Sequence, residues 1–240
     1  MSLRFEWVFF DAVDTLFRVR GSVGEVYADV AQRHGVDADP AAIEVGFRRA
    51  MRSAPPLCFP GAVPGDLEPL ERQWWRQVVS QSFAGLGSFA AFEAFFATVF
   101  DLFGTAAPWE LCEGARDVPA ALRRAGARLA VVSDMDGRLP GILAAFGLQD
   151  EFETVVLASR TGTRKHDGTL FAHALARTGA RPGAVAHVGD NVRTDIAGAQ
   201  AAGITPVHFD PQARGGAPPG VAVVHSLLDL PRILSTPARL

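Results

Sequence analysis

Three short hydrophobic runs that stop abruptly at polar residues constrain the fold more than any other feature of the sequence. The runs and the residues that follow them are 7–10 before Asp11, 129–132 before Ser133, and 185–188 before Gly189 and Asp190. Short, nearly continuous hydrophobic runs are typical of strands buried on both faces, as in a parallel sheet. Because parallel strands end at a common edge, the polar residues are expected to lie near one another.

Helical patterns alternate with these runs. They cover residues 115–125, 139–146, 169–178 and 194–202, and each ends at a glycine: Gly126, Gly147, Gly179 and Gly203. Glycine readily takes the left-handed conformation that closes many helices. The alternation predicts a doubly wound, Rossmann-like α/β domain, whose ligands bind beyond the carboxyl ends of the strands.

The segment 18–108 does not alternate in this way. Its patterns predict helices at 24–34, 40–52, 67–83 and 89–103. We therefore expect an α/β core formed by residues 1–17 and 109–240, with a small all-helical domain, 18–108, inserted after the first strand. Trp74 and Trp75 are consecutive on one predicted helix, so at least one is expected in the core. Arg48, Arg49 and Arg72 are interpreted as exposed helix residues.

Composition argues against several kinds of partner. A net charge of −3 and a pI near 6.1 give no electrostatic basis for binding nucleic acid or an anionic membrane. No apolar stretch reaches the about 18 residues of a membrane span, and the N-terminal run is too short for a signal peptide. The two cysteines form no metal-binding pair. We expect a cytoplasmic protein, and the sequence leaves its oligomeric state open.

Polar residues gather at the predicted strand ends. They are Asp11, Thr15, Ser133, Asp134 and Lys165, together with Asp190 and Asp195 of the stretch GDNVRTD. A hard divalent cation prefers octahedral oxygen ligands, and carboxylates from neighbouring strand ends plus a backbone carbonyl can supply them. Such a site would leave room for water and a phosphate group.

Together the motifs FDxxxTL, VVSD, a lysine at Lys165 and HVGDNVRTDIAGAQAAGI resemble the haloacid dehalogenase (HAD) superfamily of hydrolases. The resemblance implies that Asp11 is the nucleophile and that Ser133 and Lys165 hold the transferring group, with Asp134 and Thr15 beside them. It also implies a Mg²⁺ site. The implied ligands are Asp11, the Val13 carbonyl, Asp190 and Asp195.

A closer resemblance lies inside the inserted segment. The stretches GEVYADVAQRHGV, GFRRA and RQWWRQVV, with AHVGDN in the core, look like the haloacid dehalogenase-like hydrolase domain-containing protein 3 family. This similarity covers roughly residues 5–209. It implies an α/β core with a small helical cap after the first strand, and it implies no particular substrate.

Val13 and Asp14 depart from the superfamily pattern. Phosphatases of the superfamily usually carry a general acid where this chain has Val13, and glycine is usual where it has Asp14. Asp14 is either a turn residue or a replacement for the missing acid. The site therefore fits a magnesium-dependent phosphatase of a small phosphorylated metabolite, with an aspartyl-phosphate intermediate. Alternatives are a phospho-ligand or partner-binding protein with little turnover and, less consistent with GDNVRTD, a 2-haloacid dehalogenase.

Overall fold

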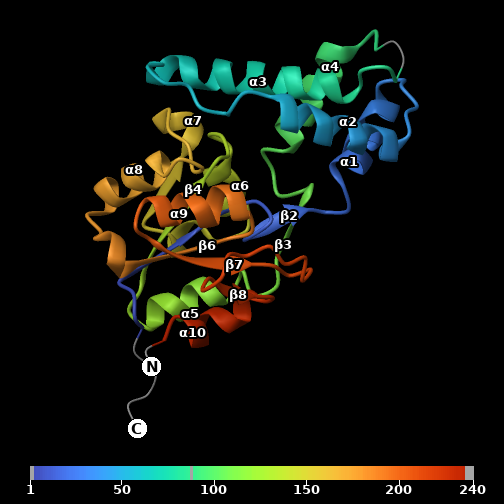
Figure 1. Ribbon diagram of the computed structural model, residues 1–240. Helices are drawn as coiled ribbons and strands as arrows, with labels where there is room; N and C mark the ends of the chain where they lie inside the picture. Colours follow the sequence, from blue (N-terminus) through green and yellow to red (C-terminus); the bar gives the residue numbers. More distant parts are fainter. Residues whose placement is uncertain (1–2, 87–88, 236–240) are drawn as a thin grey trace.

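A six-stranded, all-parallel sheet forms the centre of the computed structural model, which describes residues 3–86 and 89–235. The strand order is β5-β4-β1-β6-β7-β8 (Figure 1). The strands are β1 (Trp7–Phe10), β4 (Arg128–Ser133), β5 (Thr154–Leu157), β6 (Val185–Gly189), β7 (Thr205–Phe209) and β8 (Ala222–Val224). The predicted parallel α/β architecture is confirmed, and the three hydrophobic runs are its neighbouring strands β4, β1 and β6.

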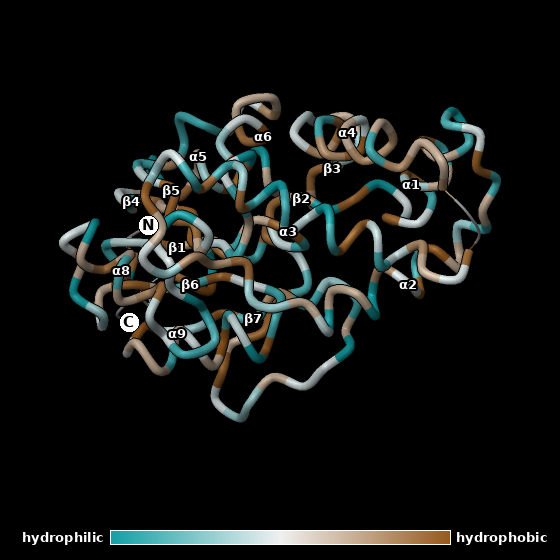
Figure 2. The backbone as a smooth tube through the Cα atoms, turned by 90° about the horizontal axis from the view of Figure 1, so that it is seen from above, coloured by the Kyte–Doolittle hydropathy of each residue, from teal (hydrophilic) through white to brown (hydrophobic). Residues whose placement is uncertain are grey.

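Helices cover both faces of this sheet. On β1, Val8 and Phe10 pack into one hydrophobic cluster, while Trp7 and Phe9 pack into another on the opposite face. Figure 2 shows hydrophobic strands between α5 and α6 on one side and α8 and α9 on the other. The helices are α5 (Val118–Arg124), α6 (Leu139–Ala145), α7 (Ala158–Thr161), α8 (Thr169–Thr178), α9 (Ala197–Ala201) and α10 (Leu230–Ile233). Short turns are η1 (Pro64–Asp66), η2 (Gln149–Glu151), η3 (Pro182–Ala184) and η5 (Leu227–Asp229).

The glycines that follow the predicted helices adopt the expected backbone conformation. The φ angles at Gly126, Gly147, Gly179 and Gly203 lie between 68° and 96°. The helix predicted at 194–202 differs, because it begins as a π-helical turn, η4 (Val192–Ile196), and continues as α9. The Asn191 side chain starts this turn by accepting hydrogen bonds from the backbone N–H groups of Arg193 and Thr194.

Four helices lie between two short strands near the start and end of the inserted segment. They are α1 (Val23–Arg33), α2 (Pro40–Ser53), α3 (Leu67–Ser82) and α4 (Phe92–Leu102), and we call residues 23–102 the helical segment. β2 (Phe17–Val19) and β3 (Trp109–Leu111) pair antiparallel where the chain enters and leaves the segment. Figure 1 shows the segment on one side of the sheet and both ends of the described chain on the other. None of the described helices combines the length and hydrophobicity needed to span a membrane.

The helical segment has its own hydrophobic cluster. Tyr27, Ile43, Val79 and Phe95 are among its buried residues, and they come from all four helices. The helix predicted at 89–103 begins at Phe92, and residues 87–88 before it lie outside the described part of the chain. The proposed division into residues 1–17 plus 109–240 and 18–108 stays a prediction, and it includes residues 1–2 and 236–240, which are also outside the description.

Gly198 allows α9 to lie against the loop that carries Lys165. A Cβ atom at position 198 would be 2.0 Å from the Lys165 carbonyl oxygen and 3.0 Å from a ring carbon of Phe171. The first contact is with backbone, so a rotamer change cannot relieve it. The close approach of α9 therefore depends on glycine at this position.

We expect Gly198→Ala to lower the free energy of unfolding by about 1–3 kcal/mol, the usual cost of overpacking. Urea denaturation measures this change. Gly183→Ala is the matched control, because a Cβ atom there would meet no atom within 4 Å. Equal stability of the two variants would show that α9 can move away from the loop without cost.

Candidate active site

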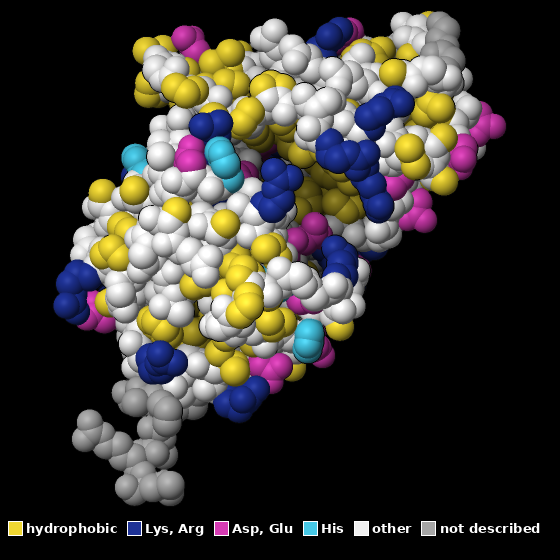
Figure 3. Space-filling view, in the orientation of Figure 1, with side chains coloured by type: hydrophobic (Ala, Val, Ile, Leu, Met, Phe, Trp, Pro, Cys, Tyr) yellow, Lys and Arg dark blue, Asp and Glu magenta, His cyan; other side chains and the backbone are white. Residues whose placement is uncertain are grey.

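A cavity of about 1140 Å³ opens between the carboxyl ends of the strands and the helical segment. Asp11 directly follows β1, Ser133 ends β4, and Asp190 directly follows β6, and all three line this cavity. Figure 3 shows the hollow, with hydrophobic side chains inside it and basic side chains around its rim. The structure thus brings together polar residues that lie up to 179 positions apart in the sequence (190 minus 11).

Lys165 connects two of the carboxylates. Its side chain is only 2% exposed, and its Nζ donates hydrogen bonds to Asp11 Oδ1 and, at 2.6 Å, to Asp195 Oδ1. Burial alone would lower the pKa of Lys165, but Asp11, Asp195 and Asp134 together hold that pKa above its usual value. The amine therefore remains charged. An ammonium group has three donors, so one N–H is left for a bound anion.

Asp195 is held on three sides. Its Oδ1 also contacts His187 Nε2 at 2.9 Å, and its Oδ2 accepts a hydrogen bond from the Asn191 backbone N–H at 3.1 Å. Burial raises the pKa of Asp195, but Lys165 and His187 outweigh it and bring that pKa below its usual value. Glycine at 189 makes this arrangement possible, because a Cβ there would lie 2.3 Å from Asp195 Cγ. His187 is buried and orients Asp195.

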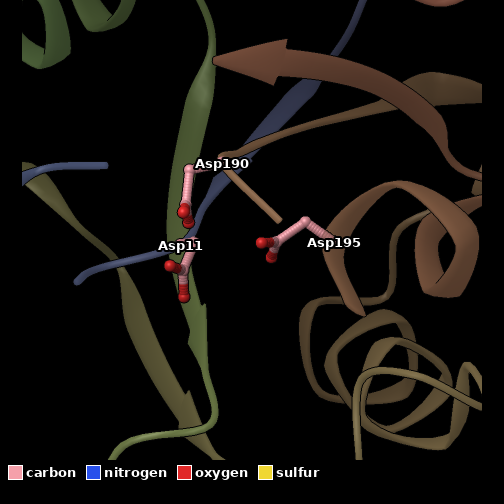
Figure 4. Close-up of side chains that lie close together, drawn as sticks. All are labelled: Asp11, Asp190 and Asp195. Atoms are coloured by element: carbon pink, nitrogen blue, oxygen red, sulfur yellow. The ribbon is translucent and has the colours of Figure 1, made fainter. Parts of the chain in front are cut away.

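Asp190 completes a group of three carboxylates. Oxygen atoms of Asp11, Asp190 and Asp195 lie within 4.8 Å of one another, and Figure 4 shows the three side chains converging. Within the described part of the chain, no lysine, arginine or histidine nitrogen approaches the Asp190 carboxylate to within 4.0 Å. Burial, followed by repulsion from Asp11 and Asp195, raises the pKa of Asp190 to about 8.

These carboxylates fit a divalent cation. Burial raises the pKa of Asp11 to about 7, although Lys165 opposes the shift. Crowded carboxylates that lack sufficient positive charge are stabilised by a cation that takes oxygen ligands. Val13, two residues after Asp11 in the chain, also lines the cavity. The residues predicted to bind metal are therefore close together, with Asp195 also holding Lys165.

Two of the residues predicted to bind phosphate line the cavity beside Lys165. Ser133 is 2% exposed, and its Oγ accepts a hydrogen bond from the Met135 N–H at 3.3 Å. Asp134 Oδ1 accepts a long hydrogen bond, 3.4 Å, from the Lys165 backbone N–H. Thr15 lies outside this group, because it is fully buried and does not line the cavity. Among the described atoms, Thr15 Oγ1 has no hydrogen-bond partner.

Asp14 occupies a strained backbone position at the cavity wall. Its φ angle is +61°, a conformation that favours glycine and that aspartate tolerates better than most residues. The side chain lines the cavity, and burial raises its pKa against the opposing charges of Arg214 and Arg18. Asp14 therefore fits both interpretations, as a turn residue and as a replacement for the missing acid.

The sequence interpretation missed the residues that join the core to the helical segment. The indole N–H of Trp75 donates to Asp136, which is fully buried and also pairs with Arg138. Glu71 accepts hydrogen bonds from the Gly137 N–H, at 3.2 Å, and from Arg160, at 2.9 Å. The acidic and basic residues of DMDGR, directly after VVS, were the available signal. Arg48, interpreted as an exposed helix residue, also lines the cavity.

The raised pKa values of Asp11 and Asp190 predict how stability depends on pH without metal. A carboxyl whose folded-state pKa is raised stabilises the fold fully below its ordinary pKa of 3.8, and this contribution is lost as the pH rises through 7 to 8. We therefore expect the wild type in EDTA to lose about 1–2 kcal/mol more stability between pH 6 and pH 9 than Asp190→Asn.

Chemical denaturation at the two pH values measures this difference. Asp37→Asn, at an exposed loop position, is the control for removing a carboxylate elsewhere and should follow the wild type. Identical pH dependence in the wild type and Asp190→Asn would contradict the proposed repulsion between the clustered carboxylates.

Comparisons with known proteins agree with this fold. A family model for haloacid dehalogenase-like hydrolases matches residues 5–203. Human haloacid dehalogenase-like hydrolase domain-containing protein 3 is 37% identical over 217 residues, covering 87% of this chain and 85% of that protein.

Two solved structures share the fold at low sequence identity. An L-2-haloacid dehalogenase from Xanthobacter autotrophicus has a TM-score of 0.71 at 19% identity, covering 95% of this chain and 98% of that chain. A HAD phosphatase from Thermococcus onnurineus has a TM-score of 0.67 at 18% identity, covering 95% and 97%. The family match and the human relative cover most of the sequence, and the chain therefore belongs to the haloacid dehalogenase-like hydrolase family.

Proposed function

We propose that the chain is a cytoplasmic, magnesium-dependent phosphatase that hydrolyses a small phosphorylated substrate through an aspartyl-phosphate intermediate. The observation that carries this proposal is the buried Lys165 ammonium, which lies between Asp11 and Asp195 at the base of the cavity. A buried cation beside a strand-end carboxylate can hold an anionic group and reduce its repulsion from the attacking oxygen.

Asp11 is the proposed nucleophile. A carboxylate oxygen of Asp11 forms a bond to phosphorus while the bond from phosphorus to the leaving oxygen breaks. Lys165 and Ser133, which line the cavity beside Asp11, hold the phosphoryl oxygens during this transfer. Water then attacks phosphorus, the bond to Asp11 breaks with its electron pair returning to the carboxylate, and the proton lost by the water passes to solvent as inorganic phosphate is released. The pairing of Lys165 with Asp195 holds the ammonium in position during both steps.

Asp11, the Val13 carbonyl and Asp190 would hold Mg²⁺, with Asp195 at the edge of the site. When bound, the cation neutralises charge that develops on the transferring phosphoryl group. Asp190 is the strongest candidate ligand in this chain because burial and two neighbouring carboxylates raise its pKa to about 8. Asp195 is already occupied by Lys165, His187 and the Asn191 N–H.

Val13 limits the leaving groups that this site can release. Positioned acid–base catalysis typically contributes roughly a factor of 10² to 10⁴ in rate, on the order of 3–5 kcal/mol. A valine side chain cannot donate a proton. The leaving oxygen therefore departs as an anion, and the proposed reaction favours leaving groups whose anions are stable.

The helical segment is the proposed cap. It contributes Phe47, Trp75, Phe100 and other cavity residues, and it contacts the core loop through Trp75 and Glu71. A cap in this position would exclude bulk water while the phosphoryl group is transferred. The paired strands β2 and β3 would carry its movement.

A second function is favoured by the same valine. Without a general acid at position 13, the chain could bind a phosphorylated ligand or partner and turn it over little. A 2-haloacid dehalogenase is less consistent with the site, because that reaction needs no magnesium and the three clustered carboxylates would have no cation to bind.

The test is hydrolysis of acetyl phosphate and p-nitrophenyl phosphate with and without Mg²⁺. We expect phosphate release that requires Mg²⁺, is abolished by EDTA, and falls at least 100-fold in Asp11→Asn, which lacks the nucleophile. Assays of phosphate release and a 2-chloropropionate control separate the three functions.

Binding of inorganic phosphate without turnover of either ester would support the binding protein instead. Chloride release from 2-chloropropionate in EDTA would support the dehalogenase. Asp37→Asn controls for nonspecific effects of removing a carboxylate, since Asp37 is exposed, lies between α1 and α2 and does not line the cavity.

Val13→Asp should restore part of the missing acid catalysis. We expect the rate on alkyl phosphates to rise by roughly 10-fold or more, while the rate on acetyl phosphate changes little because its leaving group needs no proton. Comparing kcat for the two substrates measures this. Val13→Asn is the control, because asparagine has nearly the same shape as aspartate and cannot act as an acid.

Asp14→Gly tests the alternative acid. Glycine accepts the φ of +61° without strain, so this variant removes the carboxylate and preserves the turn. We expect a smaller loss of activity than in Asp11→Asn. A wild type that cleaves alkyl and aryl phosphates equally well, with Asp14→Gly nearly as inactive as Asp11→Asn, would make Asp14 the relocated general acid.

A further inference from the structure

Asp11 and Lys165 occupy one end of a much larger cavity. The cavity measures about 1140 Å³, which exceeds the roughly 300–1,000 Å³ of common small-molecule pockets. The phosphoryl group would lie at the strand ends, so the remaining space is available to the group that leaves. The residues that line this remaining space therefore indicate which kind of leaving group fits the site.

A continuous aromatic wall lines part of this space. Phe47 packs against Tyr27 at 6.0 Å between ring centroids, Tyr27 against Phe103 at 5.7 Å, and Phe103 against Trp109 at 5.4 Å. All three contacts are edge-to-face, and all four residues line the cavity. Tyr27 and Trp109 are 2% and 5% exposed. The wall is thus fixed by its own packing before any ligand binds.

More aromatic surface comes from α3 and α4. Trp75 and Phe100 line the cavity, and the Arg138 guanidinium lies 4.1 Å from the Phe100 ring centroid and 5.3 Å from the Trp75 ring centroid. Figure 3 shows hydrophobic side chains inside the hollow between the two parts of the molecule. A flat apolar group gains both burial and ring contacts in such a space.

Most of the positive charge along the cavity is already compensated. Four arginines line it, and three of them have carboxylate partners. The pairs are Arg18 with Glu110, Arg48 with Glu44, and Arg138 with the buried Asp136. A second phosphate or carboxylate on the substrate would have to displace one of these partners or compete with Gln212 for the fourth arginine, Arg214. The outer cavity therefore favours an uncharged apolar group over a second anion.

The missing acid at Val13 selects the same kind of group for an independent reason. A phenol has a pKa of about 10, as in tyrosine, so its anion leaves without protonation far more readily than an alkoxide. An aromatic ring attached directly to the phosphate oxygen satisfies both the wall and the chemistry. An acyl phosphate has a leaving group with a stable anion but needs no aromatic ring, and a benzyl phosphate has a ring but leaves as an alkoxide.

We propose that the substrate is a small aryl phosphate whose ring lies against the wall formed by Phe47, Tyr27, Phe103 and Trp109. This inference rests on the proposed phosphatase function. Asp11 forms the bond to phosphorus, the bond between phosphorus and the phenolic oxygen breaks, and its electron pair leaves on that oxygen. Solvent protonates the phenolate. Water then attacks phosphorus, the bond from phosphorus to Asp11 breaks with its electron pair returning to the carboxylate, and the proton lost by the water passes to solvent as phosphate leaves.

Four substrates separate the effect of an aromatic ring on the kinetics from the effect of the leaving group. Phenyl phosphate has a ring and a good leaving group, benzyl phosphate has a ring and a poor one, acetyl phosphate has no ring and a good one, and ethyl phosphate has neither. With Mg²⁺ present, we expect kcat to follow the leaving group and KM to follow the ring. The KM of phenyl phosphate should be at least 10-fold lower than that of acetyl phosphate, and the KM of benzyl phosphate at least 10-fold lower than that of ethyl phosphate. Phenyl phosphate should have the highest kcat/KM.

Phe47→Leu tests the wall itself. It should raise KM for phenyl phosphate by about 3- to 10-fold, equivalent to roughly 0.7–1.4 kcal/mol, and by a smaller factor for acetyl phosphate. Phe92→Leu is the matched control, because Phe92 belongs to the same helical segment and does not line the cavity. Equal changes in KM for both substrates in Phe47→Leu would overturn the ring assignment.

The outcomes distinguish this inference from the function on which it rests. Efficient Mg²⁺-dependent hydrolysis of acetyl phosphate with no advantage for phenyl phosphate would refute the aryl substrate and leave the phosphatase intact. Calorimetry with two inert ligands does not depend on turnover, and tighter binding of phenylphosphonate than of methylphosphonate would support the wall. Equal affinity for these two ligands would refute it even in a protein without activity.

Discussion

The buried ammonium of Lys165 is the interaction on which the site depends. Three charged groups, Lys165, Asp11 and Asp195, meet where water is largely excluded. Removing charges from water is unfavourable, so such a group is stable only when each member is paired and hydrogen-bonded. The chain meets this requirement with contacts from His187 and the Asn191 N–H, and with glycines at 189 and 198 that let α9, η4 and the lysine loop approach.

Much of this arrangement follows from the sequence. Hydrophobic runs that end at Asp11, Ser133 and Asp190 predict neighbouring strand ends, and the structure has those three strands side by side. Each strand end is set by local chemistry, so sequence alone locates it. A lone lysine in a loop has no periodic signal, so only the resemblance to a family pattern identifies Lys165. The sequence does not mark the edge strand β5 in this way, because its hydrophobic residues continue into Ala158 without a polar stop.

The contacts between distant segments could not be read in this way. Asp136 and Arg138 are ordinary loop residues in the sequence, and their partners Trp75 and Phe100 lie 61 and 38 positions away. The aromatic wall likewise combines residues of α1, α2 and β3 with Phe103, directly after α4. Amphipathic patterns predict that such residues are buried and cannot say which others they meet. Thr15 shows another limit, since it matches the motif but is fully buried and does not line the cavity.

The stretch from Ser133 to Arg138 contacts both the cavity and the helical segment. Its first residues line the cavity, while Asp136, Gly137 and Arg138 bind the helical segment through Trp75, Glu71 and the Phe100 carbonyl. Moving the segment away would break buried hydrogen bonds at one end of the same short loop that bears Ser133 at the other. A ligand whose contacts with Ser133 depend on the position of this loop would bind the open and closed cleft with different affinity, and binding and closure would then be linked reciprocally. Such a ligand, bound at Ser133, would stabilise the closed position of the helical segment. A change that broke the contacts of α3 with the loop would speed the release of product.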